Sequence, residues 1–527
     1  MESEILYWII QTLLVIVRST LHLVMMIFHR GKKKVVPSVK NPMLLKSAST
    51  LARDIREGRC KSEDVIKAYI ERILEVEPCI NATAELCFDN ALKKAREVDG
   101  IIASKKYTKE QLSLEKPLFG VPISVKGLFH IKNMPFTGGS LLFSDLKVTE
   151  DAPTVATLKK AGAIVIATTN VPELGLDMET HNKIYGRTCN PYDTGRTSGG
   201  SSGGEAALIS AGASVLGLGN DFLGSLRIPA HFTGIFSHKP SRGLVSNHGS
   251  SPFERPDNLH SCNAEVFKFL ASGPMCRYAE DLITSMKVLT LDDAVRMKFD
   301  HHVDFKRVKI RYLREIRSPL IVPVDQDIAA GLENAVSYFQ KQHDTAPQEI
   351  TMPSQFDITR WIASVVVPLI NDVKASTIGE KGLGLNEKLE FAKCLIGKSR
   401  LCFSTFINLN SASNPLLYRK SQSSYYQKII EKCSDEFSKI LDENTVLLMP
   451  TMPFTAPFHL ETFPLLPSAC YVALFNVLGL PVTHCPLGFT KKGLPYGIQI
   501  VGCQNNDPLT IACAVELEKA FGGWKSC

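Results

Sequence analysis

The chain of 527 residues contains 44% hydrophobic and 21% charged residues, which is the balance of a folded globular protein and excludes an intrinsically disordered one. Its 60 basic residues stand against 53 acidic ones, and this net charge of +7 is spread too thinly to favour nucleic-acid binding. The fourteen cysteines include no C-x-x-C pair, so neither a zinc site nor a disulfide framework is indicated.

The N-terminal segment is strongly apolar. Residues 5–28 read ILYWIIQTLLVIVRSTLHLVMMIF, which is long enough to cross the hydrocarbon core of a membrane. Arg18 near the middle costs about 2.5–3.5 kcal/mol there, but the many apolar residues outweigh it. We therefore predict an uncleaved single-pass anchor, with the GKKK cluster (residues 31–34) on the cytosolic side. An interfacial helix with Arg18 snorkelling and a cleaved signal peptide are the alternatives.

Strand and helix patterns alternate through the first half of the remaining chain. SEDVIKAYIERILEVEP predicts an amphipathic helix with Ser62 as its N-cap. Further on, residues 120–128 predict a strand, residues 154–162 a helix and residues 163–170 a buried strand. This rhythm favours an α/β fold in which helices cover a central sheet.

The run SGGSSGG, residues 198–204, resembles a flexible linker in composition. It also satisfies the G-x-S-x-G pattern of a nucleophile elbow centred on Ser201, but the preceding NPYDTGRT is polar and turn-rich where an elbow requires a strand. The following EAALISAGASVLGLG reads as a helix that leads into a buried strand. The run is therefore expected to be a loop flanked by core rather than a linker.

A serine nucleophile can use a lysine as its base, provided that burial depresses the lysine pKa towards about 7–8. Lys126 ends the apolar stretch GVPISV, where burial is plausible. A lysine at the end of a strand commonly keeps its ammonium group in water, so the local sequence leaves both interpretations open.

Several widely separated segments resemble the amidase signature family. The longest is TSGGSSGGEAALISAGASVLGLGNDFLGSLRIPAHFTGIFSHKPS, and the others are GVPISVK, DAPTVATLKKAGAIVIATTNVPE, GPMCRYAEDL and LGLPVTHCPLGF. They occur in the family's order over nearly all of the chain after the apolar segment. Within the family, the chain looks most similar to the membrane-anchored fatty-acid amide hydrolases.

The resemblance implies one large α/β/α domain around a central mixed β-sheet. We accordingly expect an anchor at residues 1–30, a basic linker at residues 31–45 and an amidase domain at residues 46–527. It also implies catalysis without a metal ion or an organic cofactor.

The resemblance further assigns roles to individual residues. The family's lysine falls on Lys126, the serine that follows a cis peptide bond falls on Ser201, and the nucleophile falls on Ser225. Ser202 is expected to orient Ser201, and Gly175 to lie near bound substrate.

Two segments of the chain depart from the family pattern. The resemblance implies that backbone N–H groups of Phe222, Leu223 and Gly224, before the nucleophile, form the oxyanion hole. The family's loop usually reads D-x-G-G-S, whereas this chain has Phe222 and Leu223 at its second and third positions. If the family glycine is left-handed, Leu223 adds about 1–2 kcal/mol of strain. Gly127 follows the lysine, where an acidic or polar residue is common.

The predicted function is a serine hydrolase of fatty-acid amides that takes its substrate from the bilayer. The alternative is a catalytically impaired amidase-fold protein that binds a lipid or protein partner. Residues 356–438 read as mostly helical, and within them residues 361–370 are expected to line the substrate path or to form a buried core helix. No nucleic-acid partner is expected, a homodimer stays open, and the expected location is the endoplasmic reticulum or the lipid droplet, with the side of the membrane not fixed.

Overall fold

A computed structural model describes residues 2–31, 33–250, 264–352, 358–377, 384–411 and 420–527 of the chain. Within these residues a mixed sheet has the strand order β1-β3-β2-β6-β8-β7-β12-β13-β11-β9-β10. Its strands are β1 (Thr83–Leu86), β2 (Pro122–Lys126), β3 (Ile164–Thr169), β6 (Leu216–Asp221), β7 (Phe236–Lys239), β8 (Ala271–Cys276), β9 (Lys309–Tyr312), β10 (Gln348–Glu349), β11 (Thr445–Pro450), β12 (Val482–Phe489) and β13 (Pro495–Val501). The short strands β4 (His181–Asn182) and β5 (Gly186–Arg187) pair separately.

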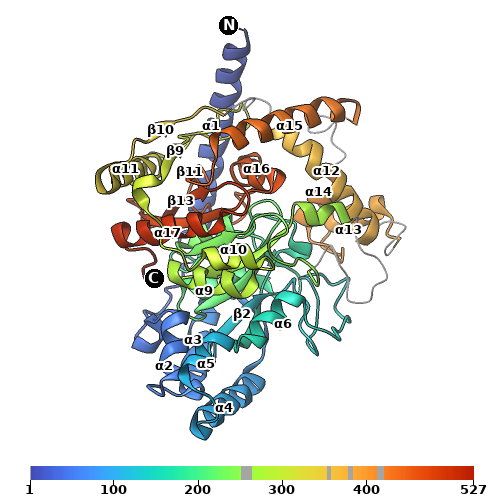
Figure 1. Ribbon diagram of the computed structural model, residues 1–527. Helices are drawn as coiled ribbons and strands as arrows, with labels where there is room; N and C mark the ends of the chain where they lie inside the picture. Colours follow the sequence, from blue (N-terminus) through green and yellow to red (C-terminus); the bar gives the residue numbers. More distant parts are fainter. Residues whose placement is uncertain (1, 32, 251–263, 353–357, 378–383, 412–419) are drawn as a thin grey trace.

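The helices surround this sheet (Figure 1). They are α1 (Glu2–Phe28), α2 (Ala48–Arg56), α3 (Ser62–Ile80), α4 (Phe88–Ser104), α5 (Lys109–Glu115), α6 (Pro153–Lys160), α7 (Gly203–Ser210), α8 (Arg227–Thr233), α9 (Ala279–Leu289), α10 (Asp293–Lys298), α11 (Gln326–His343), α12 (Ile358–Thr377), α13 (Glu387–Leu395), α14 (Phe403–Ser411), α15 (Ser423–Ile440), α16 (Cys470–Leu478) and α17 (Asp507–Phe521). The 3₁₀ helices η2 (Glu173–Gly175) and η7 (Phe463–Ala469) border the site described below.

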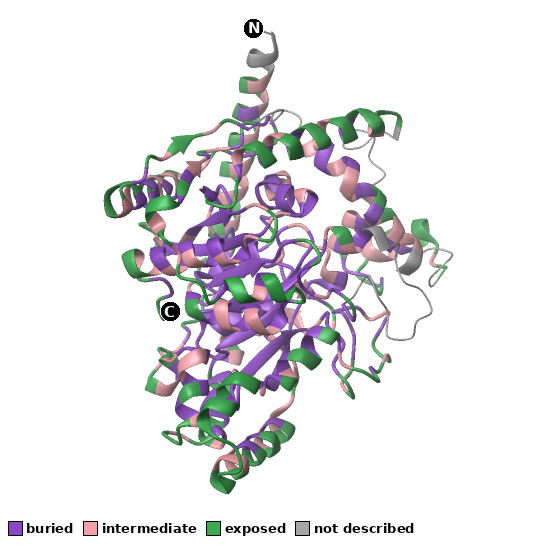
Figure 2. Ribbon diagram, in the orientation of Figure 1, coloured by how far each residue is buried: buried purple, intermediate pink, exposed green. Residues whose placement is uncertain are grey.

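The centre of the sheet is covered on both faces. Every residue of β2, β3, β6 and β8 is buried, and Figure 2 shows these strands in purple beneath outer helices that carry much green. Strands buried on both sides read as continuous apolar runs, which is why the sequence pattern located β2 and β3. The α/β fold with a central mixed sheet is therefore confirmed.

The first body helix differs from the prediction at its N-terminus. Lys61 is the N-cap of α3, and the carboxylate of Asp99 accepts hydrogen bonds from the N–H groups of Ser62 and Glu63. The hydroxyl of Ser62 instead donates to the carbonyl of Gly120 at 3.0 Å. The prediction that Ser62 is the N-cap is thus wrong, because a distant acid supplies the cap.

The predicted helical region contains α12, α13, α14 and α15, which lie together on one side of the molecule in Figure 1. Residues 356–357, 378–383 and 412–419 of that region lie outside the described residues, as does Lys32 of the basic cluster. The apolar N-terminal segment forms α1, and Tyr7–Phe28 is long and apolar enough to cross a membrane. In Figure 1 its first turns project beyond the body.

Candidate active site

Lys126 is the last residue of β2 and is fully buried. Its Nζ lies 2.8 Å from Ser201 Oγ and 2.6 Å from Asn220 Oδ1, and it also contacts the Asn220 carbonyl at 3.2 Å. Burial lowers the pKa of the amine to about 7, against the opposing effect of the carboxyls of Asp221 and Glu205. A lysine with this pKa is largely neutral just above pH 7, so it can accept a proton.

Asn220 is a site residue that the sequence analysis missed. It lies in β6, which pairs with β2, and its Nδ2 donates to Ser250 Oγ at 2.6 Å. That bond holds Oδ1 towards the lysine. Only the pairing of β2 with β6 brings Asn220 to Lys126, and such long-range pairing is not visible in one sequence.

Ser201 and Ser225 complete a line of hydrogen bonds that begins at the lysine. Ser201 follows a cis peptide bond with Gly200, and its Oγ is hydrogen-bonded to Ser225 Oγ at 2.9 Å. Ser201 is 3% exposed, whereas Ser225 is half-buried and lines a large cavity. The line Lys126–Ser201–Ser225 can therefore carry a proton between the cavity and a buried amine.

The serine-glycine run packs too tightly to be a linker. Gly199 has a φ of +86°, and a Cβ at this position would lie 2.7 Å from Pro229 Cα in α8. The run leads directly into α7, as expected from the sequence.

The side chain of Ser202 does not make the contact with Ser201 that its expected orienting role would require. Its hydroxyl points to the Asn220 carbonyl at a long 3.4 Å, and no hydrogen bond to Ser201 is present within the described residues. The contact of Ser202 with the site is through its backbone N–H, which donates to the Ser225 carbonyl at 3.2 Å.

The loop that carries Ser225 is fixed by a fully buried ion pair. The Nε and Nη2 groups of Arg227 each donate a hydrogen bond to the Asp221 carboxylate at 3.0 Å. The Asn476 side chain is hydrogen-bonded to both residues of the pair. Burial opposes ionisation of Asp221, but Arg227 outweighs it and lowers the Asp221 pKa to about 2. A bidentate pair of this kind restricts both position and orientation of the loop.

The expected oxyanion donors are arranged differently from the prediction. The Gly224 N–H donates to Asp221 Oδ1 at 2.7 Å, so it points away from the cavity. Among the described residues, the N–H groups of Leu223 and Ser225 have no hydrogen-bond partner. Phe222 and Leu223 both line the cavity.

The strain anticipated at Leu223 is absent. Leu223 is not among the described residues with positive φ, whereas Gly224 has a φ of +108°. A Cβ on Gly224 would lie 2.2 Å from Val472 Cγ2. The glycine that this loop needs is therefore Gly224, and it is present.

The cavity beside Ser225 has a volume of about 520 Å³, within the usual range for a small-molecule site. Gly175 in η2 borders it, as does Gly200. One part of the cavity lining comes from α12, and another part comes from η7 and α16. The lining residues of these parts are Thr359, Ile362, Ala363, Val366, Val367, Ile370, Phe463, Pro464, Leu466, Pro467, Ala469, Cys470 and Ala473.

Gly127 explains the second departure from the family pattern. A Cβ at Gly127 would lie 2.7 Å from the Thr169 carbonyl oxygen, so the close approach of β3 favours glycine at this position.

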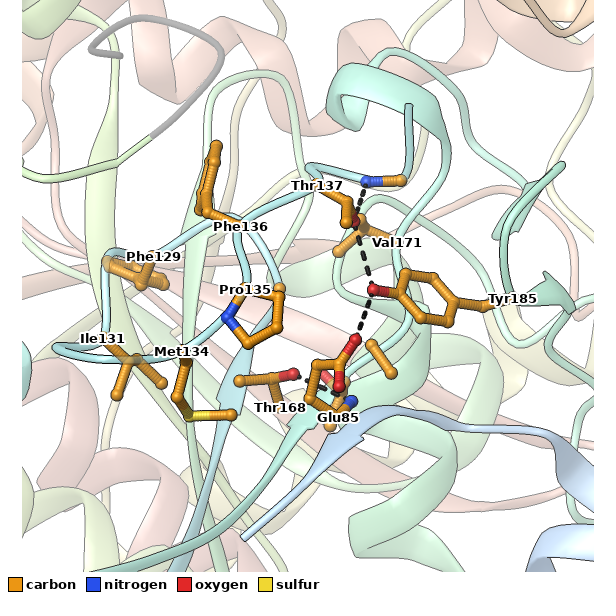
Figure 3. A pocket seen from close by; sticks show the side chains of 14 residues that line it. Glu85, Phe129, Ile131, Met134, Pro135, Phe136, Thr137, Thr168, Val171 and Tyr185 are labelled. Atoms are coloured by element: carbon orange, nitrogen blue, oxygen red, sulfur yellow. Dashed lines mark hydrogen bonds between the residues drawn. The ribbon is translucent and has the colours of Figure 1, made fainter. Parts of the chain in front are cut away.

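Polar side chains line a small pocket beside Gly127. Figure 3 shows Tyr185 between Glu85 and Thr137, with its hydroxyl donating to Glu85 at 2.8 Å.

Comparisons with known proteins agree with this architecture. A sequence model of the amidase family matches residues 64–511. Fatty-acid amide hydrolase 2-A of Danio rerio is 38% identical over 496 residues, which are 93% of this chain and 91% of that protein. Fatty-acid amide hydrolase 2 of Homo sapiens is 37% identical over 492 residues, 92% of this chain and 91% of that protein.

The fold is also similar to a solved structure described as fatty acid amide hydrolase. The TM-score is 0.74 at 22% identity, with 92% of this chain and 86% of that one covered. The family match over most of the chain, together with relatives above one-third identity, establishes that this chain belongs to the amidase family.

Proposed function

We propose that this amidase cleaves the amide bond of fatty-acid amides, through an acyl-enzyme on Ser225, and releases an amine or ammonia. The observation that carries the proposal is the hydrogen-bonded line from buried Lys126 through Ser201 to Ser225, where it meets an apolar cavity. A nucleophile, a base and a relay between them are the parts that acyl transfer requires.

The proton path follows the two short contacts. Ser225 Oγ gives its proton to Ser201 Oγ as it attacks the amide carbonyl, while Ser201 gives its own proton to neutral Lys126. When the tetrahedral intermediate collapses, Ser201 protonates the departing nitrogen and recovers its proton from Lys126. Protonation of the leaving nitrogen is the demanding step for an amide. Water then enters along the same relay, attacks the ester on Ser225 and frees the fatty acid.

We assign stabilisation of the oxyanion to backbone amides of the Ser225 loop. The N–H groups of Leu223 and Ser225 are the supported donors, and Phe222 stays a predicted one. Donors of this kind contribute about 100- to 1,000-fold each to the rate. The buried Asp221–Arg227 pair would hold these amides in place before substrate arrives.

The substrate class rests on the shape and chemistry of the cavity. Its walls are nearly all aliphatic or aromatic, and side chains of the predicted segment 361–370 form one of them. An acyl chain fits such walls because its burial is favourable by about 25 cal/mol per Å². The names of the curated relatives point to the same substrates.

Membrane association is the second part of the proposal. The helix α1 is a candidate membrane segment by length and composition. The endoplasmic reticulum or the lipid droplet remains the predicted location, and a homodimer remains open.

The direct test is release of free fatty acid from oleamide by detergent-solubilised protein. We expect turnover by the natural chain and by Ser202→Ala, whose hydroxyl makes only a long contact, and none by Ser225→Ala. Absence of turnover in the natural chain, together with absence of labelling by a fluorophosphonate, would favour the alternative of a silent amidase fold that binds a lipid or protein partner.

A further inference from the structure

The helix α1 makes contacts that a detached membrane anchor would not make. Gln11 is 5% exposed, and its Nε2 donates to the carbonyls of Ser318 and Ile321, each at 2.7 Å. Arg18 lies 3.7 Å from the Asp325 carboxylate, and its guanidinium stands over a phenylalanine ring of the body. These are specific polar contacts between the helix and the body.

Two histidines continue the same line of contacts. His22 Nδ1 donates to Glu461 Oε1 at 2.8 Å, and His29 stacks on Phe458 with an interplanar angle of 4°. At 3.6 residues per turn, Gln11, Arg18, His22 and His29 fall within an arc of about 40°. These four polar side chains thus form one stripe, and that stripe faces the body.

The opposite side of α1 is apolar and uncovered. Within residues 7–28, eleven large apolar side chains are 42% or more exposed. They are Trp8, Ile9, Leu13, Val15, Ile16, Val17, Leu23, Val24, Met26, Ile27 and Phe28. A contiguous exposed face of this kind marks a contact with lipid or with another protein.

The rim of the active-site cavity adjoins this helix. Leu320 lies between Ser318 and Ile321, whose carbonyls accept hydrogen bonds from Gln11, and it lines the cavity and is 39% exposed. Phe463 in η7 also lines the cavity and is 63% exposed. Leu14 of α1 packs in the same apolar cluster as Leu466, another lining residue. Through Leu14, the helix α1 therefore lies beside the apolar lining of the cavity.

A perpendicular span is incompatible with these contacts. From Gln11 to His29 the helix runs along the body for about 27 Å, at 1.5 Å per residue. That length is nearly the full hydrocarbon thickness of about 30 Å. A span would carry Asp325, Glu461 and the loops around them into the hydrocarbon, where charged groups are costly.

We propose that α1 is an integral, docked part of the amidase body and lies in the plane of one membrane leaflet. Its polar stripe holds the body, and its apolar side enters the lipid beside Leu320 and Phe463. The entrance of the cavity then opens at the membrane surface. The last point rests on the proposed function, whereas the in-plane position does not.

Topology gives the first test. Epitope tags at the N- and C-terminus are exposed to protease on sealed microsomes, with and without detergent. A docked, in-plane α1 places both tags on the same side, so both are cut or both are protected. Tags on opposite sides of the membrane would overturn the proposal.

Charge on the outer face gives the second test. Ile16→Glu, in an exposed position on α1, is compared with Leu114→Glu, an exposed leucine of α5 at the far end of the molecule in Figure 1. We expect Ile16→Glu to weaken co-sedimentation with phosphatidylcholine vesicles at least about tenfold and Leu114→Glu to leave it unchanged.

Two further results would overturn the proposal. One is equal vesicle binding by both variants. The other is dissociation of a detergent-stable dimer by Ile16→Glu without loss of vesicle binding, since that would assign the face to a second copy of the chain. Oleamide turnover in detergent is measured in parallel, because its absence would count against the proposed function and leave the topology result intact.

Discussion

The floor and the wall of the active-site cavity are built in opposite ways. The floor is the end of the central sheet, where Lys126 and the Asp221–Arg227 pair are fully buried and saturated with hydrogen bonds. The wall is made by α12 and η7, whose side chains contact the cavity through apolar surface and are partly exposed. Hydrogen bonds in the floor fix the positions of the catalytic atoms. The wall contacts the substrate only through its shape and its apolar surface.

This contrast indicates which changes each part tolerates. A polar network in a low-dielectric interior loses its function when one member is removed, because the remaining groups are left unpaired. An apolar wall loses affinity in proportion to the area or volume that changes. Floor variants should therefore change the rate by orders of magnitude, and wall variants should shift selectivity.

The largest expected effect is that of Ser225→Ala. Loss of the attacking oxygen should lower the rate of amide hydrolysis by at least about 10⁴-fold, as for serine nucleophiles in other hydrolases. Steady-state release of fatty acid is the measurement. Retention of more than about 1% of the rate would place the nucleophile elsewhere.

Lys126→Met should be the next most damaging change. It keeps most of the length and the apolar stem of the side chain but removes the amine that acts as the base, so we expect a loss of about 100- to 10,000-fold. In the natural chain, kcat/KM should fall as the pH drops below about 7, because protonation of Lys126 removes its capacity to accept a proton. A pH profile that stays flat down to pH 5.5 would contradict the assigned base.

The Asp221–Arg227 pair should affect stability as well as rate. Asp221→Asn leaves a buried guanidinium without its counter-charge, which should lower the free energy of unfolding by about 3–5 kcal/mol. The Asp221 pKa is depressed to about 2, so its stabilisation is present above about pH 4 and is lost as the pH falls towards 2. Denaturant unfolding of both proteins at pH 7 and pH 3 should show a difference that shrinks at the lower pH. An equal difference at the two pH values would contradict this account.

The floor and the wall of the cavity also differ in how much of each could be predicted from the sequence. Buried runs located β2 and β3, and a family resemblance placed Lys126, Ser201 and Ser225, which the structure brings into one hydrogen-bonded line. Asn220 was not found because its role depends on the pairing of β2 with β6.

Other misses share the same cause. Ser62 was predicted as an N-cap, but the caps come from Asp99, which is distant in sequence. Gly224 was predicted as an oxyanion donor, but its N–H is bound by Asp221. The sequence analysis did not identify the polar stripe of α1, because its role depends on the surface of the body that the helix contacts. Local patterns thus predict elements, and long-range partners decide what each polar group does.

Ala363→Phe tests the wall. Ala363 lines the cavity from α12, so the larger ring should fill the space of part of an acyl chain. We expect kcat/KM for oleamide to fall about tenfold or more, with the value for a short-chain amide nearly unchanged. The ratio of the kcat/KM values for the two amides is an internal control, because a general loss of active protein lowers both values equally. An equal loss for both would place Ala363 outside the acyl site.

The smallest expected effect is that of Leu223→Gly, which restores the residue usual in the family. Because Leu223 does not adopt positive φ, the substitution should relieve no strain and should change the rate by less than about tenfold. Gly224→Ala is the contrasting change, since its Cβ would meet Val472 and its φ is +108°. It should reduce the rate by about 100-fold or more through displacement of the Ser225 loop. Reversal of this order would refute the assignment of Gly224 as the required glycine.

The most direct test of the central claim is the pH dependence of fluorophosphonate labelling, with the modified residue mapped by peptide mass spectrometry. The account predicts label on Ser225, at a rate that falls about tenfold per pH unit below the Lys126 pKa of about 7. No label, label on a different serine, or a rate that does not change between pH 5.5 and 8 would contradict the relay from Ser225 through Ser201 to Lys126.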